Sequence, residues 1–204
     1  MTSHPDLPGR IWQPGEELAD TAEQWDVARS ERPYDGGFVA VRQDTVRTPA
    51  GDEFDRLVVE HKGAVGVVAL DADDRVLLLR QYRHAAGRRL LELPAGILDL
   101  DGESARDAVA RELVEETDVA ADDWDLLVEV WSSPGMTDEH WQVFVATGLT
   151  PAPEGSVPER HHEEAHMEVV WVPLAEAVRA VLDRRITDSM AMVGLLAEWA
   201  RRHG

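Results

Sequence analysis

The sequence predicts an α+β fold with a mostly β body, one helix inserted early and two helices near the C-terminal end. Short segments with alternating or continuous apolar residues fill most of the chain and indicate strands. Residues 105–117 and two later segments carry apolar residues at helical spacing instead. With 204 residues, the chain is long enough for one domain with an extension.

The N-terminal extension, residues 1–62, is expected to contain a β-hairpin and to take part in dimer formation. The hairpin consists of two segments in which apolar and polar residues alternate, at residues 38–48 and 54–61. Turn residues at 49–52 join them. Residues 1–36 have no clear period. They contain Trp12 and Trp25, which we expect to pack in the core or in an interface.

The remaining region, residues 63–204, is predicted to form the main domain. Its strands are expected at residues 64–70, 75–82, 89–93, 124–132, 141–149 and 167–172. A helix should begin near Ala105, where Ser104 and Asp107 form a capping pattern. Two amphipathic helices should follow at residues 174–182 and 188–202.

The composition limits the classes of partner. The formal net charge is −20, which repels nucleic-acid backbones and anionic membrane surfaces. No run of eighteen apolar residues is present, and the first residues lack the apolar core of a signal peptide. The absence of cysteine excludes disulfides and thiolate metal sites. We therefore expect a cytoplasmic protein with no nucleic-acid or membrane partner.

The predicted helix at residues 105–117 carries a dense acidic face. Glu112, Glu115 and Glu116 fall within five residues, and the three- and four-residue spacing places them on one side. At about 4 Å, each pair would repel by up to roughly 4 kcal/mol at an effective dielectric near 20. This face must therefore lie in water or bind a cation, and Mg²⁺ suits carboxylates and phosphates. The alternative is a solvated helix with ion pairs such as Arg111–Glu115.

The segment around this helix resembles the Nudix hydrolase signature. Six residues separate Gly96 from Glu103, and seven separate Glu103 from the string at residues 111–116. Val119 ends the match. The loop before Glu103 is one residue longer than in the general signature, which is similar to the ADP-ribose pyrophosphatase branch. Asp118 replaces the final glycine of the signature. We expect Asp118 to end the helix in a left-handed conformation, at a cost of about 1 kcal/mol.

The resemblance implies a Nudix fold, with a mixed β-sheet sandwiched between helices and an N-terminal β-hairpin extension. It also implies a Mg²⁺ site, for which Mn²⁺ can substitute. In that site Glu112 and Glu116 would bind the metal, the Ala95 carbonyl would add a ligand, and Glu115 would be a secondary or shared ligand. Structural roles would fall to Gly96, Glu103 and Arg111.

Further residues match the ADP-ribose branch outside the signature. Arg83, in the segment Gln81-Tyr82-Arg83, would contact the diphosphate, and Arg56 would do so across a dimer. The loop at residues 133–139 resembles the substrate-specificity loop and supplies Met136 and Glu139 as substrate-binding candidates, with Glu139 near the terminal ribose. For both arginines, a surface ion pair is the alternative.

The loop at residues 150–165 is the longest irregular stretch, and long loops in compact domains are often functional. The family places its general base on this loop, and the nearest match is Glu164, with Glu163 as the alternative. Glu164 would also touch the metal. A zinc site from His162 and His166, and a simple solvated loop, are the other interpretations.

These residues together predict an enzyme of the Nudix pyrophosphohydrolase type, working as a homodimer on a small nucleotide. The expected reaction is hydrolysis of a nucleoside diphosphate sugar, with ADP-ribose giving AMP and ribose 5-phosphate. Other Nudix substrates are a nucleoside triphosphate, a dinucleoside polyphosphate and GDP-mannose. Two other classes are a non-catalytic ADP-ribose-binding module and a structural module that uses the tryptophans.

Overall fold

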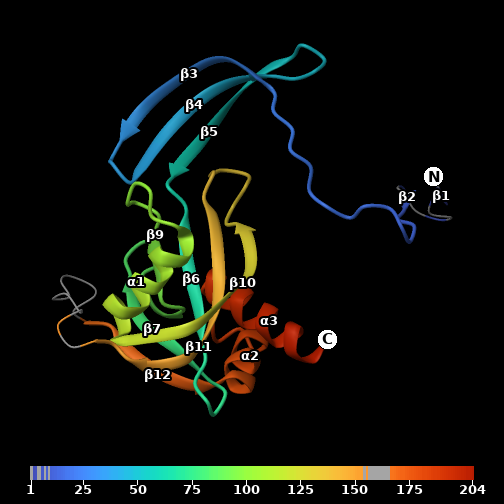
Figure 1. The fold of residues 1–204 in the computed structure, drawn as a ribbon. Helices are drawn as coiled ribbons and strands as arrows, with labels where there is room; N and C mark the ends of the chain where they lie inside the picture. The colour runs from blue at the N-terminus through green and yellow to red at the C-terminus, as the bar shows by residue number, and fades with distance from the viewer. Residues whose placement is uncertain (1, 4–5, 7, 9, 154, 156–165) are drawn as a thin grey trace.

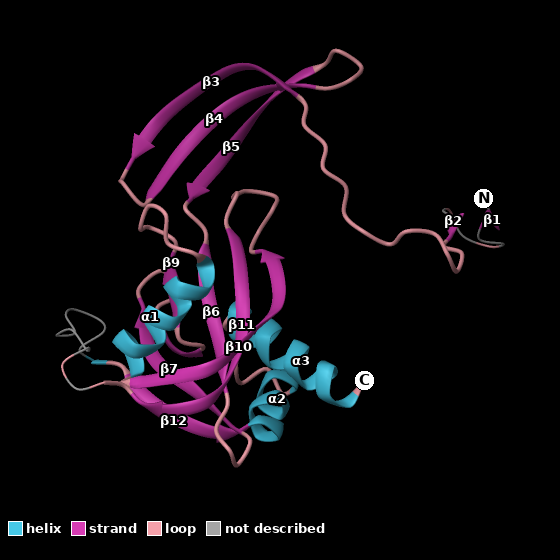
Figure 2. Cartoon of the chain, in the orientation of Figure 1, coloured by secondary structure: helices cyan, strands magenta, loops and turns pink. Residues whose placement is uncertain are grey.

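The computed structural model describes residues 2–3, 6, 8, 10–153, 155 and 166–204. In this part of the chain, two β-sheets and the helices against them form a body, and a third sheet rises from one end of it (Figure 1). The short strands β1 (Thr2–Ser3) and β2 (Arg10–Ile11) pair with each other and lie away from both parts (Figure 2).

The body contains a four-stranded and a three-stranded sheet. The four-stranded sheet has the order β10-β11-β6-β9, in which β11 runs parallel to β6, and the other sheet has the order β12-β7-β8. Their strands are β6 (Ala64–Ala69), β7 (Arg75–Arg83), β8 (Arg88–Glu92), β9 (Ala95–Ile97), β10 (Val119–Trp131), β11 (His140–Pro151) and β12 (Glu168–Pro173).

The helices lie on opposite sides of these sheets, which confirms the predicted α+β class. They are α1 (Ala105–Thr117), α2 (Leu174–Leu182) and α3 (Ser189–His203). Alternate residues of β6 and β7 face opposite ways, because side chains in a strand alternate. Val65 and Leu77 therefore pack with Leu113 of α1, whereas Val68 and Leu78 pack in the cluster with α2 and α3. Burial on both faces explains why these strands are continuous apolar runs.

The ends of α1 agree with the sequence. Ser104 caps the helix by accepting a hydrogen bond from the backbone N–H of Asp107. Asp118 ends it with φ of 59°, the left-handed conformation expected of the residue that replaces glycine. Both predictions are confirmed, and they fix the start and end of the helix that carries the acidic face.

The C-terminal helix is held by a buried carboxylate. Glu198 is 0% exposed and accepts hydrogen bonds from Arg201 and Arg202. Arg202 also pairs with Asp74 in the turn between β6 and β7, which joins α3 to the sheets. Burial favours the neutral acid, but the two arginines outweigh it and hold the pKa of Glu198 below its ordinary value.

The N-terminal extension differs from the prediction. A third strand, β3 (Asp26–Asp35), joins β4 (Val39–Arg47) and β5 (Glu53–His61), so the expected hairpin is a three-stranded sheet. Every residue of β3 is exposed, so the strand buries no apolar face and has no period to detect. Residues 95–97 form β9 beside β6 instead of only a turn, and β10 begins earlier than residue 124.

No helix in the described chain is both long and apolar enough to span a membrane.

Candidate active site

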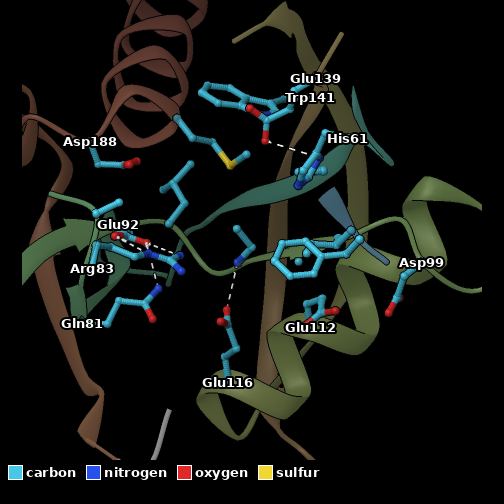
Figure 3. Close-up of a pocket in the computed structure, with 18 of the residues that line it drawn as sticks. His61, Gln81, Arg83, Glu92, Asp99, Glu112, Glu116, Glu139, Trp141 and Asp188 are labelled. Atoms are coloured by element: carbon cyan, nitrogen blue, oxygen red, sulfur yellow. Dashed lines mark hydrogen bonds and ion pairs between the residues drawn. The ribbon is translucent and has the colours of Figure 1, made fainter. Parts of the chain in front are cut away.

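A cavity of about 710 Å³ lies where the loop before α1, the end of β7 and the start of α3 meet (Figure 3). Acidic and basic side chains from elements far apart in the sequence point into it. Its charged and imidazole-bearing lining residues are His61, Arg83, His84, Glu92, Asp99, Arg111, Glu112, Glu116, Glu139 and Asp188. The cavity is therefore a polar pocket of a size that suits a small, charged ligand.

The strand β9 lies directly against the acidic face of α1. The backbone N–H of Ala95 donates a hydrogen bond of 2.9 Å to the carboxylate of Glu116, which is only 9% exposed. At Gly96, an added Cβ would lie 2.1 Å from the Glu112 carboxyl carbon. Glycine is required there because the backbone and the carboxylate share a space that a side chain would fill. This contact explains the glycine at the start of the motif.

Arg111 organises the acids around it. Its Nε and Nη2 donate to the two carboxylate oxygens of Glu103 at 3.1 and 3.0 Å. Its Nη1 donates to Glu112 at 2.7 Å and to Glu115 at 3.2 Å. Burial raises the pKa of Glu112, and the nearby Arg111 opposes that rise. The arginine therefore ties the loop that carries Glu103 to the acidic face of α1.

The carboxylates of Glu112 and Glu116 suit a divalent cation whose remaining coordination positions are filled by other ligands. Glu112 and Glu116 both line the cavity from one face of α1, whereas Glu115 does not line it. The residues that the structure describes contain no cluster of three acidic, histidine or cysteine side chains that could already hold a metal. Glu163 and Glu164, the expected general base and additional ligand, lie outside the described residues, as does His162 of the alternative zinc site.

Arg83, at the end of β7, also lines the cavity. Its Nε donates to both oxygens of Glu92, at 3.0 and 3.1 Å, and its Nη2 donates at 2.7 Å (Figure 3). Gln81 donates to the same carboxylate at 2.8 Å. The hydrogen bonds with Glu92 raise the pKa of Arg83, which as a guanidinium is charged in any case. An arginine fixed beside a carboxylate-lined cavity is well suited to bind phosphate oxygens.

The loop at residues 133–139 is anchored to β5. The Thr137 hydroxyl donates to the Val59 carbonyl at 2.7 Å, and the His61 backbone N–H donates to Asp138 at 2.9 Å. Glu139 consequently lines the cavity beside His61, with 3.6 Å between its Oε1 and Nδ1 of the imidazole. Met136 is 56% exposed and does not line the cavity.

Arg56 also lies outside the cavity of the single chain. Its guanidinium carbon is 4.3 Å from the centre of the Phe54 ring, on the extension sheet. The prediction for Arg56 requires a second chain, so it stays a prediction.

Several residues of this site were not predicted from the sequence. Glu92, His61, Trp141 and Asp188 line the cavity but belong to no motif. Glu92 could have been noticed as a single acid within the apolar run at residues 90–95. The other three are brought to the cavity by tertiary packing, which no local pattern reveals.

Comparisons with known proteins identify the family of the chain. The NUDIX domain family matches residues 60–191. An ADP-ribose pyrophosphatase from Mycobacterium tuberculosis is 46% identical over 173 residues, which cover 85% of this chain and 82% of that protein. A methanol dehydrogenase activator from Bacillus methanolicus is 30% identical, with coverage of 82% and 88%.

A solved structure gives the same fold. The crystal structure of an ADP compounds hydrolase superposes with a TM-score of 0.72 at 23% identity, and covers 91% of this chain and 99% of that one. The matched family region contains the cavity's loop, α1 and the end of β7, so the predicted fold and family are confirmed. The chain belongs to the NUDIX domain family and is a Nudix hydrolase.

Proposed function

We propose that the protein hydrolyses the diphosphate bond of ADP-ribose in a Mg²⁺-dependent reaction, giving AMP and ribose 5-phosphate. The observation that carries this proposal is the cavity that is lined both by Glu112 and Glu116 of α1 and by Arg83. The 46% identical relative named for ADP-ribose supports the choice of substrate.

The acids of α1 supply the metal-binding side of the proposed site. Glu112 and Glu116 would hold Mg²⁺. The Ala95 carbonyl would be a further ligand, and Glu115 would be a secondary or shared ligand. Bound Mg²⁺ offsets the charge of the diphosphate and makes a nearby water easier to deprotonate. Mn²⁺ takes the same oxygen ligands and is expected to substitute.

The remaining residues bind the substrate and move a proton. Arg83 would hold phosphate oxygens, which matters because the chain carries a net charge of −20 and would otherwise repel the substrate. Glu164, with Glu163 as the alternative, would take a proton from the attacking water. The water oxygen bonds to one phosphorus, and the bridging oxygen leaves on the other phosphoryl group with the electrons of the broken bond. Glu139 is a proposed contact to the terminal ribose. Met136 lies outside the cavity, and its role as a substrate contact stays a prediction.

A substrate panel tests this function. The protein with Mg²⁺ should release AMP and ribose 5-phosphate from ADP-ribose, measured by chromatography, at a higher kcat/KM than for GDP-mannose, a nucleoside triphosphate or a diadenosine polyphosphate. Turnover should vanish with EDTA and return with added Mg²⁺ or Mn²⁺. A higher kcat/KM for another compound in the panel would show that ADP-ribose is not the preferred substrate, although the protein would still be a Nudix hydrolase. No turnover of any compound would refute the proposal.

We also propose a homodimer formed through the extension sheet. The sheet exposes large apolar side chains, including Val27 at 48%, Tyr34 at 57% and Leu57 at 60%. Exposed large apolar side chains on one sheet are compatible with a protein interface. A dimer would also place Arg56 near a second chain. Light scattering should give twice the mass of the chain, and Leu57→Glu should shift the measured mass toward that of a monomer. A monomeric parent protein would refute the dimer.

Cytoplasmic location stays a prediction.

A further inference from the structure

Glu92 is a buried carboxylate in the wall of the cavity, and no motif accounts for it. It is 4% exposed and lies at the end of β8, in an otherwise apolar run. A buried carboxylate is costly unless a cation and hydrogen bonds compensate it. Gln81 and Arg83 supply those hydrogen bonds and that cation.

The strand register explains why these three side chains meet. Leu79 of β7 is paired with Glu92 of β8, and Gln81 and Arg83 follow at positions two and four residues along β7. Side chains two residues apart share a face, so all of them project to the same side. Arg83 reaches back along the sheet to Glu92, with Gln81 between them.

The contact leaves part of Arg83 available to a ligand. The hydrogen bonds described for this guanidinium use Nε and Nη2, and its side chain is 52% exposed where it lines the cavity. One edge of the planar group is therefore fixed to Glu92. Among the described residues none hydrogen-bonds to Nη1, so this nitrogen can reach phosphate oxygens. An arginine on a long flexible side chain loses less freedom on binding when one edge is already held.

Glu92 also connects the arginine to the acidic face of α1. Three residues after Glu92, the N–H of Ala95 donates to Glu116 at 2.9 Å. The segment at residues 92–95 is thus bonded to Arg83 at one end and to α1 at the other. This short backbone segment therefore joins two parts of the cavity lining.

We propose that Glu92 is a positioning residue, which holds the Arg83 guanidinium in the orientation that binds the substrate diphosphate. This inference rests on the proposed function, because it takes Arg83 as the diphosphate contact. Glu92 itself would touch neither substrate nor metal. It would act through Arg83 alone.

A double-mutant cycle tests this role with Glu92→Gln, Arg83→Gln and the double variant. Glutamine has nearly the same size as glutamate and can still hydrogen-bond, so Glu92→Gln changes mainly charge. Arg83→Gln removes the guanidinium and leaves a shorter polar side chain. Steady-state assays with ADP-ribose and Mg²⁺ should show kcat/KM lower by roughly 10- to 100-fold for Glu92→Gln, the range for losing a residue that orients a functional group. The double variant should be no worse than Arg83→Gln, because Glu92 has no other route to the substrate.

The affinity of the free protein for Mn²⁺, measured by electron paramagnetic resonance, separates this role from metal binding. Glu92→Gln should leave that affinity within about twofold of the parent, whereas a metal ligand would lose more than tenfold. If Glu92→Gln does not fold by circular dichroism, Glu92→Asp takes its place in the cycle. It retains the charge but shortens the reach to Arg83, and should give an intermediate loss.

The outcomes distinguish the two proposals. Losses that multiply in the double variant, unchanged kcat/KM in Glu92→Gln, or weaker Mn²⁺ binding would each overturn the role of Glu92. Normal kcat/KM in Arg83→Gln would instead remove Arg83 as the diphosphate contact. Absence of ADP-ribose turnover in the parent protein would refute the proposed function itself.

Discussion

Gly96→Ala is predicted to disable the enzyme by displacing a carboxylate, without disturbing the backbone. The φ angle of Gly96 lies outside the left-handed region, so alanine can adopt the same conformation. The new Cβ would, however, lie 2.1 Å from Cδ, 2.2 Å from Oε1 and 2.3 Å from Cγ of Glu112. No side chain can remain at those distances.

The size of the effect follows from the displacement. Ordinary van der Waals contact begins near 3.4 Å, so the carboxyl carbon of Glu112 must move by about 1.3 Å. A misplacement of about 1 Å in a catalytic group can cost about 100-fold. We therefore expect kcat/KM to fall about 100-fold, equivalent to about 2.7 kcal/mol in transition-state free energy. The loss should be accompanied by weaker Mn²⁺ binding.

The assay is steady-state hydrolysis of ADP-ribose, with the melting temperature measured in parallel. The matched control is Gly96→Ala in a Glu112→Ala background, where the clashing atoms are absent. There the extra methyl group should change kcat/KM by less than about threefold, because the two changes remove the same interaction. Near-normal activity of the single variant would show that the Glu112 carboxylate has no fixed place in catalysis, and would refute the reasoning.

Three further predictions concern other acids. Glu116→Gln should lower turnover by more than about 100-fold while the fold persists, because Gln can still accept the Ala95 N–H but lacks the charge for a metal; normal turnover would remove it as a ligand. Glu164→Gln should lower kcat more than substrate affinity, and a larger effect of Glu163→Gln would move the general base by one residue. The lowered pKa of Glu198 means that its ion pairs stabilise the fold fully above the ordinary pKa of about 4.5, and that this stability is lost as pH falls through the folded-state pKa. Glu198→Gln should therefore destabilise the protein near neutral pH by about 1–3 kcal/mol, and the gap should narrow in acid; a gap that is constant with pH in urea unfolding would contradict this.

The helix α1 could be predicted because its signals are local. The Ser104 cap, the acidic spacing and Asp118 at the end all depend on residues a few positions apart. The strand β3 could not be predicted, since all its residues are exposed and backbone pairing with β4 leaves no sequence period. Local signals therefore gave the helix that carries the acids, but not the full extension.

Only part of the candidate site could be predicted from the sequence, for the same reason. The acids of α1 form a recognisable string in the sequence. Glu92 on β8 contacts Gln81 and Arg83 only because β8 pairs with β7. The close approach of Gly96 to Glu112 also appears only once β9 is placed against α1. Contacts between elements set these relationships, and a linear pattern does not record them.

Crystals soaked with Mn²⁺ and a non-cleavable ADP-ribose analogue test the central claim most directly. Anomalous scattering should place Mn²⁺ beside the carboxylates of Glu112 and Glu116, with the diphosphate between the metal and Arg83. If the metal binds elsewhere, or if the diphosphate occupies a different surface while these acids stay bonded to Arg111 and Ala95, the account of this cavity as a metal-dependent hydrolase site is wrong.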